Sequence, residues 1–248
     1  MTLITRIRWA TVTVLTAAVL LYAGDKKDKP KPVAAKQVDA GSFGVFVKGQ
    51  RVVTETFSVQ QDNGISVVKA QLKETGGQAA TDQRSELEMS SGGDLIRYEW
   101  SDSKGSLVVA PDNEFLRETI TTSGSPKPVE QPFLMPNKTA ILDNNFIVHR
   151  EVLLWRYLAT APCQDEAGGR KCQSADFGVL VPQDRTSMPV RVELVGKDKV
   201  TIHGTERELL KLNLKGDAFS WALWVDQNDQ FKLIRVLIAD ANTEVVRD

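Results

Sequence analysis

The feature that most constrains this chain is an alternation of apolar and polar residues in many short segments. Within Glu206–Lys215, leucines at 210, 212 and 214 alternate with polar residues at 211, 213 and 215, and Phe219–Val225 continues this period. A period of two places every second side chain on one face of a strand, as in a sheet with one buried face. Turn signals such as Asp-Asn-Gly at 62–64 separate the segments and suit hairpins. The sequence therefore predicts a mainly β protein with one curved antiparallel sheet, a half-barrel.

One long segment breaks this rhythm. From Thr139 to Leu158, apolar residues recur at helical spacing. The expected buried face consists of Leu142, Phe146, Leu153 and Tyr157, widened by Ile147, Leu154 and Leu158. Thr139 or Asp143 could serve as the N-cap. We expect one amphipathic helix packed on the concave face of the sheet.

Two further features concern how the strands are connected. Prolines at 126, 128, 132 and 136 lie just before the predicted helix. Because proline lacks a backbone N–H, we expect this connection to be extended coil and not a strand. After the helix, Pro189–Val195 and Lys199–His203 are predicted as two separate strands, with Gly196 between them.

The N-terminal segment has the pattern of an export signal. Arg6 and Arg8 precede an uncharged run from Trp9 to Gly24, after which charges resume at Asp25. The run is shorter than the roughly 20 residues that span a bilayer comfortably, so a cleaved signal and an uncleaved membrane anchor both remain open. We expect residues 1–24 to be signal or anchor, 25–40 a flexible linker and 41–248 a single β-rich domain. The domain would then be exported, either periplasmic or held at the membrane by its N-terminal segment.

The two cysteines agree with export. Cys163 and Cys172 flank a polar loop that contains Gly-Gly at 168–169. In an oxidising compartment such a pair is expected to form a disulfide, which we favour over two free thiols.

The charge balance and the motif content limit the classes of function. Lys plus Arg (31) nearly equals Asp plus Glu (32), so no basic field is present that would attract nucleic acid. Only His149 and His203 could act as bases near neutral pH, and no nucleophile motif, phosphate-binding loop or dinucleotide fingerprint accompanies them. Two histidines do not make a metal site, and we expect no metal and no cofactor. We expect His149 to be a structural histidine.

A resemblance to a known family rests on three stretches. These are the hairpin GVFVKGQRVVTETFSVQ at 44–60, the lone helix segment reading ILDNNF…LLWRYL, and the hairpin FSWALWVDQNDQFKLIRVLI at 219–238. In these stretches the chain resembles exported bacterial half-barrel proteins similar to LolA and LolB, the lipoprotein carrier and outer-membrane lipoprotein-receptor families. The resemblance implies a curved sheet with an apolar concave face that receives acyl chains. It carries no site residue over to this chain.

These observations lead to three ranked hypotheses. We favour a non-enzymatic envelope protein that binds a hydrophobic small molecule, a lipid-like acyl chain or an envelope partner between helix and sheet. The second is a structural or interaction module with a solid core, and the third is a hydrolase with an unrecognised site. Trp221 and Trp224 are three residues apart in a strand and should face opposite ways. The predicted ligand-binding residues are Leu142, Phe146, His149, Leu153, Tyr157 and Trp221.

Overall fold

A computed structural model describes residues 35–75, 82–125, 127–136, 138–166 and 169–248. The chain divides into two units, residues 1–33 and 34–248, and every described residue belongs to the second. The predicted signal or anchor at 1–24 and the predicted linker up to residue 34 lie outside the described residues. No helix among the described residues is long and apolar enough to cross a membrane.

The first half of this unit is a run of eight strands. In chain order they are β1 (Lys36–Val47), β2 (Gln50–Asp62), β3 (Ile65–Glu74), β4 (Gln83–Ser90), β5 (Leu95–Ser101), β6 (Gly105–Asp112), β7 (Phe115–Thr122) and β8 (Val129–Phe133). Asn63 and Gly64 between β2 and β3 have φ values of 46° and 81°, as the predicted Asn-Gly hairpin turn requires.

The second half contains the α-helix and the remaining strands. They are β9 (Ala140–Ile141), α1 (Val148–Thr160), β10 (Cys163–Glu166), β11 (Gly169–Cys172), β12 (Ala175–Val181), β13 (Thr186–Ile202), β14 (Thr205–Gly216), β15 (Phe219–Asp226), β16 (Lys232–Ile238) and β17 (Thr243–Arg247). Short 3-10 helices at Pro182–Asp184 and Ala239–Ala241 follow β12 and β16.

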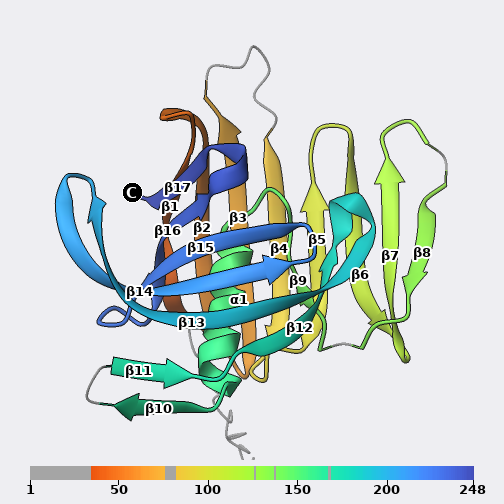
Figure 1. Cartoon of the computed structure of the whole chain (residues 1–248). Helices are drawn as coiled ribbons and strands as arrows, with labels where there is room; N and C mark the ends of the chain where they lie inside the picture. The colour runs from red at the N-terminus through yellow and green to blue at the C-terminus, as the bar shows by residue number, and fades with distance from the viewer. Residues whose placement is uncertain (1–34, 76–81, 126, 137, 167–168) are drawn as a thin grey trace, which may run out of the picture. The chain divides into compact units, whose positions relative to one another are not determined.

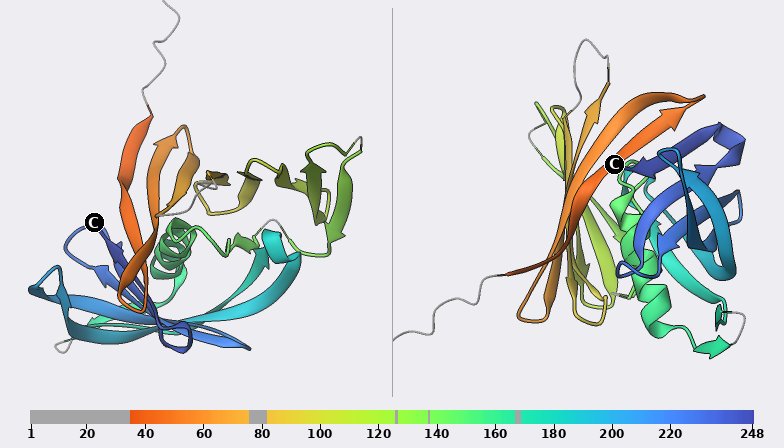
Figure 2. Two further views of the ribbon diagram at one scale, coloured as in Figure 1. Left: turned by 90° about the horizontal axis from the view of Figure 1, so that it is seen from above. Right: turned by 90° about the vertical axis from the view of Figure 1, so that its left-hand side faces the viewer.

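Fifteen of the strands form one curved sheet that does not close into a barrel. Its order is β8-β7-β6-β5-β4-β3-β2-β1-β17-β16-β15-β14-β13-β12-β9, and only the pair of β9 with β12 is parallel. The sheet bends around α1, so that β1–β8 lie on one side of the helix and β12–β16 on the other (Figures 1 and 2). The predicted mainly β fold, with one helix on the concave face of a curved sheet, is confirmed.

The main core fills the space between the two halves of the sheet. It joins side chains of α1, such as Leu154 and Tyr157, to inward residues of both halves, such as Val68 and Leu212. A smaller cluster on the other face of β13–β16 contains Trp224, while Trp221 packs against the main core. The two tryptophans therefore face opposite ways, as predicted.

The disulfide is also confirmed. Cys163 and Cys172 are bonded, and they are paired residues of the small β10–β11 hairpin. The hydroxyl of Tyr157 donates to the carbonyl of Gln173 at 3.0 Å and accepts from the N–H of Leu194 at 3.2 Å. The buried side of α1 thus contacts both the end of this hairpin and β13.

The predicted helix start at Thr139 is wrong. The helix begins at Val148, and the preceding residues form β9 and a turn. The Leu142 N–H donates to the carbonyl of Leu180, and the Asp143 side chain accepts from two following N–H groups. These hydrogen bonds use backbone groups that the first helical turn would need if the helix began where the apolar spacing begins.

Two predicted strand boundaries are corrected. β8 occupies part of the connection expected to be coil; Pro132 is accommodated there because β8 is an edge strand. The two strands expected at 189–195 and 199–203 are one strand, β13. Gly196 has a φ of 136° and marks a register shift against β14, so it forms a bulge in the strand and does not end it.

The predicted start of the folded domain at Gly41 falls inside β1. The predicted linker includes residues 36–40 because the segment from residue 25 is rich in Lys, Pro and Asp and lacks periodicity, yet Lys36 already pairs with Gln61 of β2. Asp39 is 4% exposed and forms an ion pair with Arg247, so one of these polar residues is a buried structural group.

Candidate functional site

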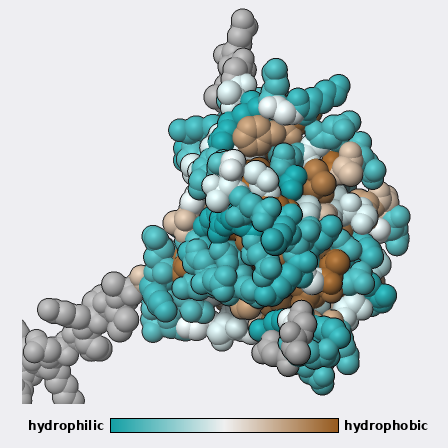
Figure 3. Space-filling model, turned by 60° about the vertical axis from the view of Figure 1, so that its left-hand side comes forward, coloured by the Kyte–Doolittle hydropathy of each residue, from teal (hydrophilic) through white to brown (hydrophobic). Residues whose placement is uncertain are grey.

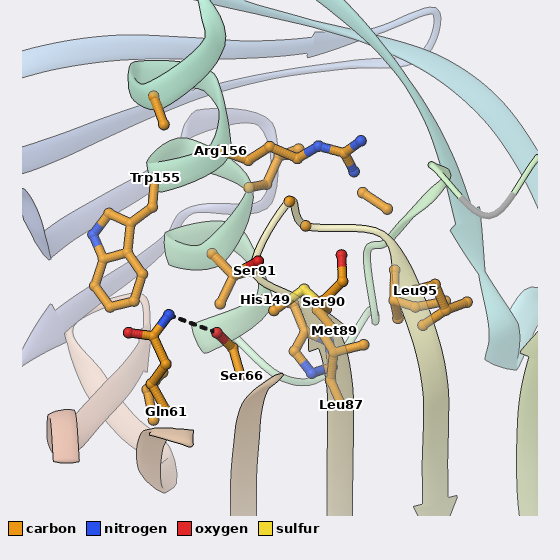
Figure 4. Close-up of a pocket in the computed structure, with 18 of the residues that line it drawn as sticks. Gln61, Ser66, Leu87, Met89, Ser90, Ser91, Leu95, His149, Trp155 and Arg156 are labelled. Atoms are coloured by element: carbon orange, nitrogen blue, oxygen red, sulfur yellow. Dashed lines mark hydrogen bonds between the residues drawn. The ribbon is translucent and has the colours of Figure 1, made fainter. Parts of the chain in front are cut away.

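A mainly apolar hollow lies between α1 and β2–β5. Its volume is about 330 Å³. Side chains from β2, β4 and β5 form one wall, and side chains from α1 form the other (Figure 4). The apolar lining residues are Val38, Val59, Leu87, Met89, Leu95, Ala140, Ile141, Val152, Leu153, Trp155 and Ala159. We call this space the helix cavity.

Polar groups occupy fewer positions of the lining. Gln61 and Ser66 are joined by a hydrogen bond of 3.4 Å, from the side-chain amide to the hydroxyl (Figure 4). Ser90 and Ser91 come from the β4–β5 turn, which faces the side of α1 that carries Arg156 (Figure 4). The remaining polar or charged members are Thr139, His149, Arg156 and Thr160. The cavity therefore combines an extended apolar surface with a few hydrogen-bonding groups.

His149 is the buried polar group of this lining. Its side chain is 1% exposed, and neither ring nitrogen has a hydrogen-bond partner among the described residues. The ring lies edge-on to Tyr98, with 5.6 Å between centroids. Burial lowers the pKa of His149 to about 4, and the charge of Arg150 adds to this effect while Asp143 opposes it. At neutral pH the imidazole is uncharged, with one donor and one acceptor.

The start of α1 is held in place by buried side chains from outside the helix. The carboxylate of Glu55 on β2 accepts from the N–H groups of Ile147 and Val148, at 2.6 and 3.1 Å. Arg150 is also buried and donates to the carbonyls of Asp143 and Phe146, both at 2.6 Å. Burial lowers the pKa of Arg150 to about 10 and raises that of Glu55 to about 8. These contacts fix the helix that forms one wall of the cavity.

The six predicted ligand-binding residues are only partly brought together. His149 and Leu153 line the helix cavity. Leu142, Phe146 and Tyr157 are at most 3% exposed and belong to the main core. Trp221 lines a separate hollow of about 330 Å³, where its ring lies 4.7 Å from the guanidinium carbon of Arg150.

Sequence reasoning missed most of the cavity wall. Leu87 and Met89 alternate with charged residues, which suits an inward face, but the local pattern does not show whether they border a cavity or pack against a neighbour. Arg156 was missed because a charged residue within a helix is most often simply solvated. Its signal was its position: three and four residues after Leu153 and Val152, it lies on the same side of the helix.

Neither histidine forms a hydrogen bond to another side chain in the described part of the chain. His203 lies on an exposed turn with a φ of 49°, and its Nε2 is 2.8 Å from the carbonyl oxygen of Arg247. His149 contacts neither a hydroxyl nor a carboxylate within hydrogen-bond distance among the described residues. Within the described ranges no group of three His, Cys, Asp or Glu side chains could hold a metal ion.

Comparison with protein-family models, with curated proteins and with solved structures finds no match to this chain.

Proposed function

We propose that this chain is an exported, non-enzymatic protein of the cell envelope that binds an apolar, acyl-chain-like ligand in the helix cavity. The observation that carries the proposal is the cavity itself, about 330 Å³ of mainly apolar space beside a buried helix. Ligand sites in proteins are typically concave, mostly apolar and about 300–1,000 Å³ in volume, with a few polar groups that orient the ligand. The helix cavity has each of these properties.

His149 gives this proposal further support. Buried polar groups in proteins nearly always have a hydrogen-bond partner. The neutral imidazole of His149 lines the cavity and has none among the described residues. A polar atom of a ligand, or a water molecule that enters with it, would supply this partner.

Export rests on different observations. The N-terminal run of uncharged residues and the Cys163–Cys172 disulfide both suit a protein that leaves the cytoplasm. Export can be tested with a fusion of residues 1–40 to alkaline phosphatase, because this enzyme is active only outside the cytoplasm. Phosphatase activity in intact cells is expected, and its absence with normal expression would contradict export.

The surface favours a ligand site over an interaction module. The exposed large apolar residues of the described chain are spread over several elements; they are Ile65, Ile96, Val129, Leu134 and Val195. The face drawn in Figure 3 is mainly hydrophilic, with apolar side chains in separate areas. An interaction module with a solid core would be expected to show a contiguous apolar patch instead.

A neutral apolar probe tests ligand binding directly. Delipidated protein should increase the fluorescence of N-phenyl-1-naphthylamine, an uncharged probe, with saturation. Val152→Phe places a larger side chain in the cavity and should weaken this binding by about tenfold, because hydrophobic pockets discriminate by size on this scale. Val246→Phe is the matched control, since Val246 is also a half-buried valine but packs on the other face of the sheet.

Two results would overturn the proposal. One is the absence of saturable probe binding by folded, delipidated protein, which would favour the solid-core module. The other is equal loss of binding in the Val152→Phe and Val246→Phe variants when circular dichroism shows that both are folded, which would place the probe elsewhere.

A further inference from the structure

Arg156 is the one residue in the lining of the helix cavity that carries a charge at neutral pH. The lining contains no aspartate, glutamate or lysine, and the imidazole of His149 is neutral. A binding site whose fixed charge is a single cation favours an anionic partner.

The guanidinium of Arg156 has no carboxylate and no hydrogen-bond acceptor as a partner among the described residues. It forms neither an ion pair nor a side-chain hydrogen bond with any described residue, although it is half-buried. Among the described arginines, Arg170 also lacks an ion pair and a side-chain hydrogen bond. The others pair with carboxylates, except Arg150, which donates to backbone carbonyls. Asp94 is near enough for its charge to act on Arg156, but none of its oxygens lies within 4 Å.

The side chain of Arg156 is positioned by two contacts. Its aliphatic part passes close to Gly93, where a Cβ would lie only 3.4 Å from the Arg156 Cδ. Its guanidinium carbon lies 5.8 Å from the centre of the Phe177 ring. In Figure 4 the side chain extends past the β4–β5 turn that carries Ser90 and Ser91. The cation thus lies at one side of an apolar space whose lining also includes Ser90 and Ser91.

From this arrangement we propose that the ligand of the helix cavity is a single-chain carboxylate, a fatty acid. Its carboxylate pairs with Arg156 beside the serines of the β4–β5 turn, and its chain occupies the apolar part of the cavity. This inference rests on the proposed function and specifies the chemical class of the ligand. A guanidinium presents two parallel N–H groups that match one carboxylate. A dianionic phosphate ester would need a second cation, which the lining does not provide.

Ligands that share one chain and differ in the headgroup test the inference. Dodecanoate, dodecanol, dodecyl phosphate and dodecyltrimethylammonium, each below its micelle concentration, would compete with N-phenyl-1-naphthylamine for wild-type protein. Dodecanoate is expected to bind about tenfold more tightly than dodecanol, since a charge-assisted hydrogen bond contributes on this scale. Dodecyltrimethylammonium is expected to bind more weakly than dodecanol.

Three arginine variants distinguish the contribution of the headgroup contact from that of the apolar cavity to ligand binding. Arg156→Gln should lower the affinity for dodecanoate to that for dodecanol, with dodecanol unchanged, and Arg156→Lys should restore part of the preference. Arg170→Gln removes the other unpaired guanidinium, which is outside the cavity lining, and should leave the preference intact. Circular dichroism checks that each variant is folded.

The failures of the two proposals are distinguishable. If the neutral probe binds and responds to Val152→Phe, but dodecanoate and dodecanol bind equally, the carboxylate assignment is overturned and the cavity site stands. Tighter binding of dodecyl phosphate than of dodecanoate, or an equal effect of Arg156→Gln and Arg170→Gln, overturns the assignment as well. Absence of all binding overturns both proposals.

Discussion

The carboxylate of Glu55 accepts a hydrogen bond of 3.1 Å from the N–H of Val148, 93 residues further along the chain. The same side chain also accepts from the adjacent Ile147 N–H at 2.6 Å. The residue at the N-cap position of α1, Ile147, has no side chain that could cap the helix. A strand of the sheet therefore satisfies the first free N–H groups of the helix, which a local N-cap residue would otherwise do.

Replacement of Glu55 should destabilise the protein in proportion to the hydrogen bonds that it loses. Glu55→Gln keeps one acceptor oxygen and should lower the free energy of unfolding by about 1 kcal/mol, and Glu55→Ala by about 2–3 kcal/mol. Urea denaturation measures both. Glu86→Gln on the outward face of β4, where Glu86 pairs with the exposed Lys69, is the control and should change stability by less than about 1 kcal/mol. Equal effects of Glu55→Ala and Glu86→Gln would show that the cap contributes nothing.

Arg247 joins both ends of the described chain to the helix. Its guanidinium contacts Asp39 of β1 at 2.6 Å and Glu151 of α1 at 3.3 Å. The side chains of Asp39 and Glu151 are 2% and 0% exposed, so Arg247 is the cation that faces two buried carboxyl groups. Burial raises the pKa of Glu151 to about 8, and the charge of Asp39 raises it further while Arg247 opposes the rise.

Loss of this counter-charge should be costly. Arg247→Met leaves the buried Asp39 with Lys232, 3.7 Å away, and removes the hydrogen-bond donor to Glu151. It is expected to lower the free energy of unfolding by about 3 kcal/mol. Arg51→Met is the matched control, because Arg51 pairs with Asp248 at a position about one-third exposed and should cost less than about 1 kcal/mol. Thermal or urea unfolding of both variants provides the comparison. A loss for Arg247→Met no larger than that for Arg51→Met would rule out this role.

The strands could be predicted because the alternation of apolar and polar residues that identifies a strand lies within the strand itself. A strand with one buried face shows its period in five to ten residues, and the alternating segments at 206–215 and 219–225 are strands β14 and β15 in the structure. The start of α1 could not be predicted in this way. It depends on Glu55, on the carbonyl of Leu180 and on the pairing of β9 with β12, all distant in sequence from the helix.

The candidate site was less predictable than the fold. Whether an inward side chain packs against a neighbour or borders a cavity depends on how both halves of the sheet curve, which no short segment encodes. The buried carboxylates did leave a signal. Glu55 lies between Val53 and Phe57, and Glu118 between Leu116 and Ile120, at positions whose alternation points inward. A charged residue at an inward position is a reason to expect a structural or functional contact.

Glu118 should make stability depend on pH between about 4.5 and 7. Its carboxylate is buried, and neither oxygen has a hydrogen-bond partner among the described residues. Burial raises its pKa to about 7, although Arg185, 4.0 Å away, opposes the rise. Because the folded state holds this proton more tightly than the unfolded state, the resulting stability is present below pH 4.5 and is lost as the pH rises through 7.

The Glu118→Gln variant isolates this effect. Between pH 6 and pH 8 the wild-type protein should lose about 1 kcal/mol more of its free energy of unfolding than Glu118→Gln does. Urea denaturation of both proteins at the two pH values measures the difference, and the other titrating groups contribute to both. Parallel pH profiles would show that Glu118 does not titrate in this range.

His149 should have the opposite pH dependence. Its pKa is lowered in the folded state to about 4, so the unfolded chain takes up the proton first as the pH falls. The stability linked to the neutral imidazole is therefore present above pH 6.5 and is lost as the pH falls towards 4. From pH 7 to pH 4.5, wild type should lose about 2 kcal/mol more than His149→Leu.

The same variant tests whether His149 is needed for packing at neutral pH. Because the imidazole has no hydrogen bond to a described residue, its replacement by leucine should change the free energy of unfolding by less than about 1 kcal/mol at pH 7. Tyr98→Phe is the contrasting control: it removes a hydroxyl that contacts Asp143 and Gln183 and should cost about 1–3 kcal/mol. A larger loss of stability for His149→Leu than for Tyr98→Phe would mean that the imidazole has a hydrogen-bond partner in solution. A ligand or a water molecule bound in the helix cavity would then be the first candidate for that partner.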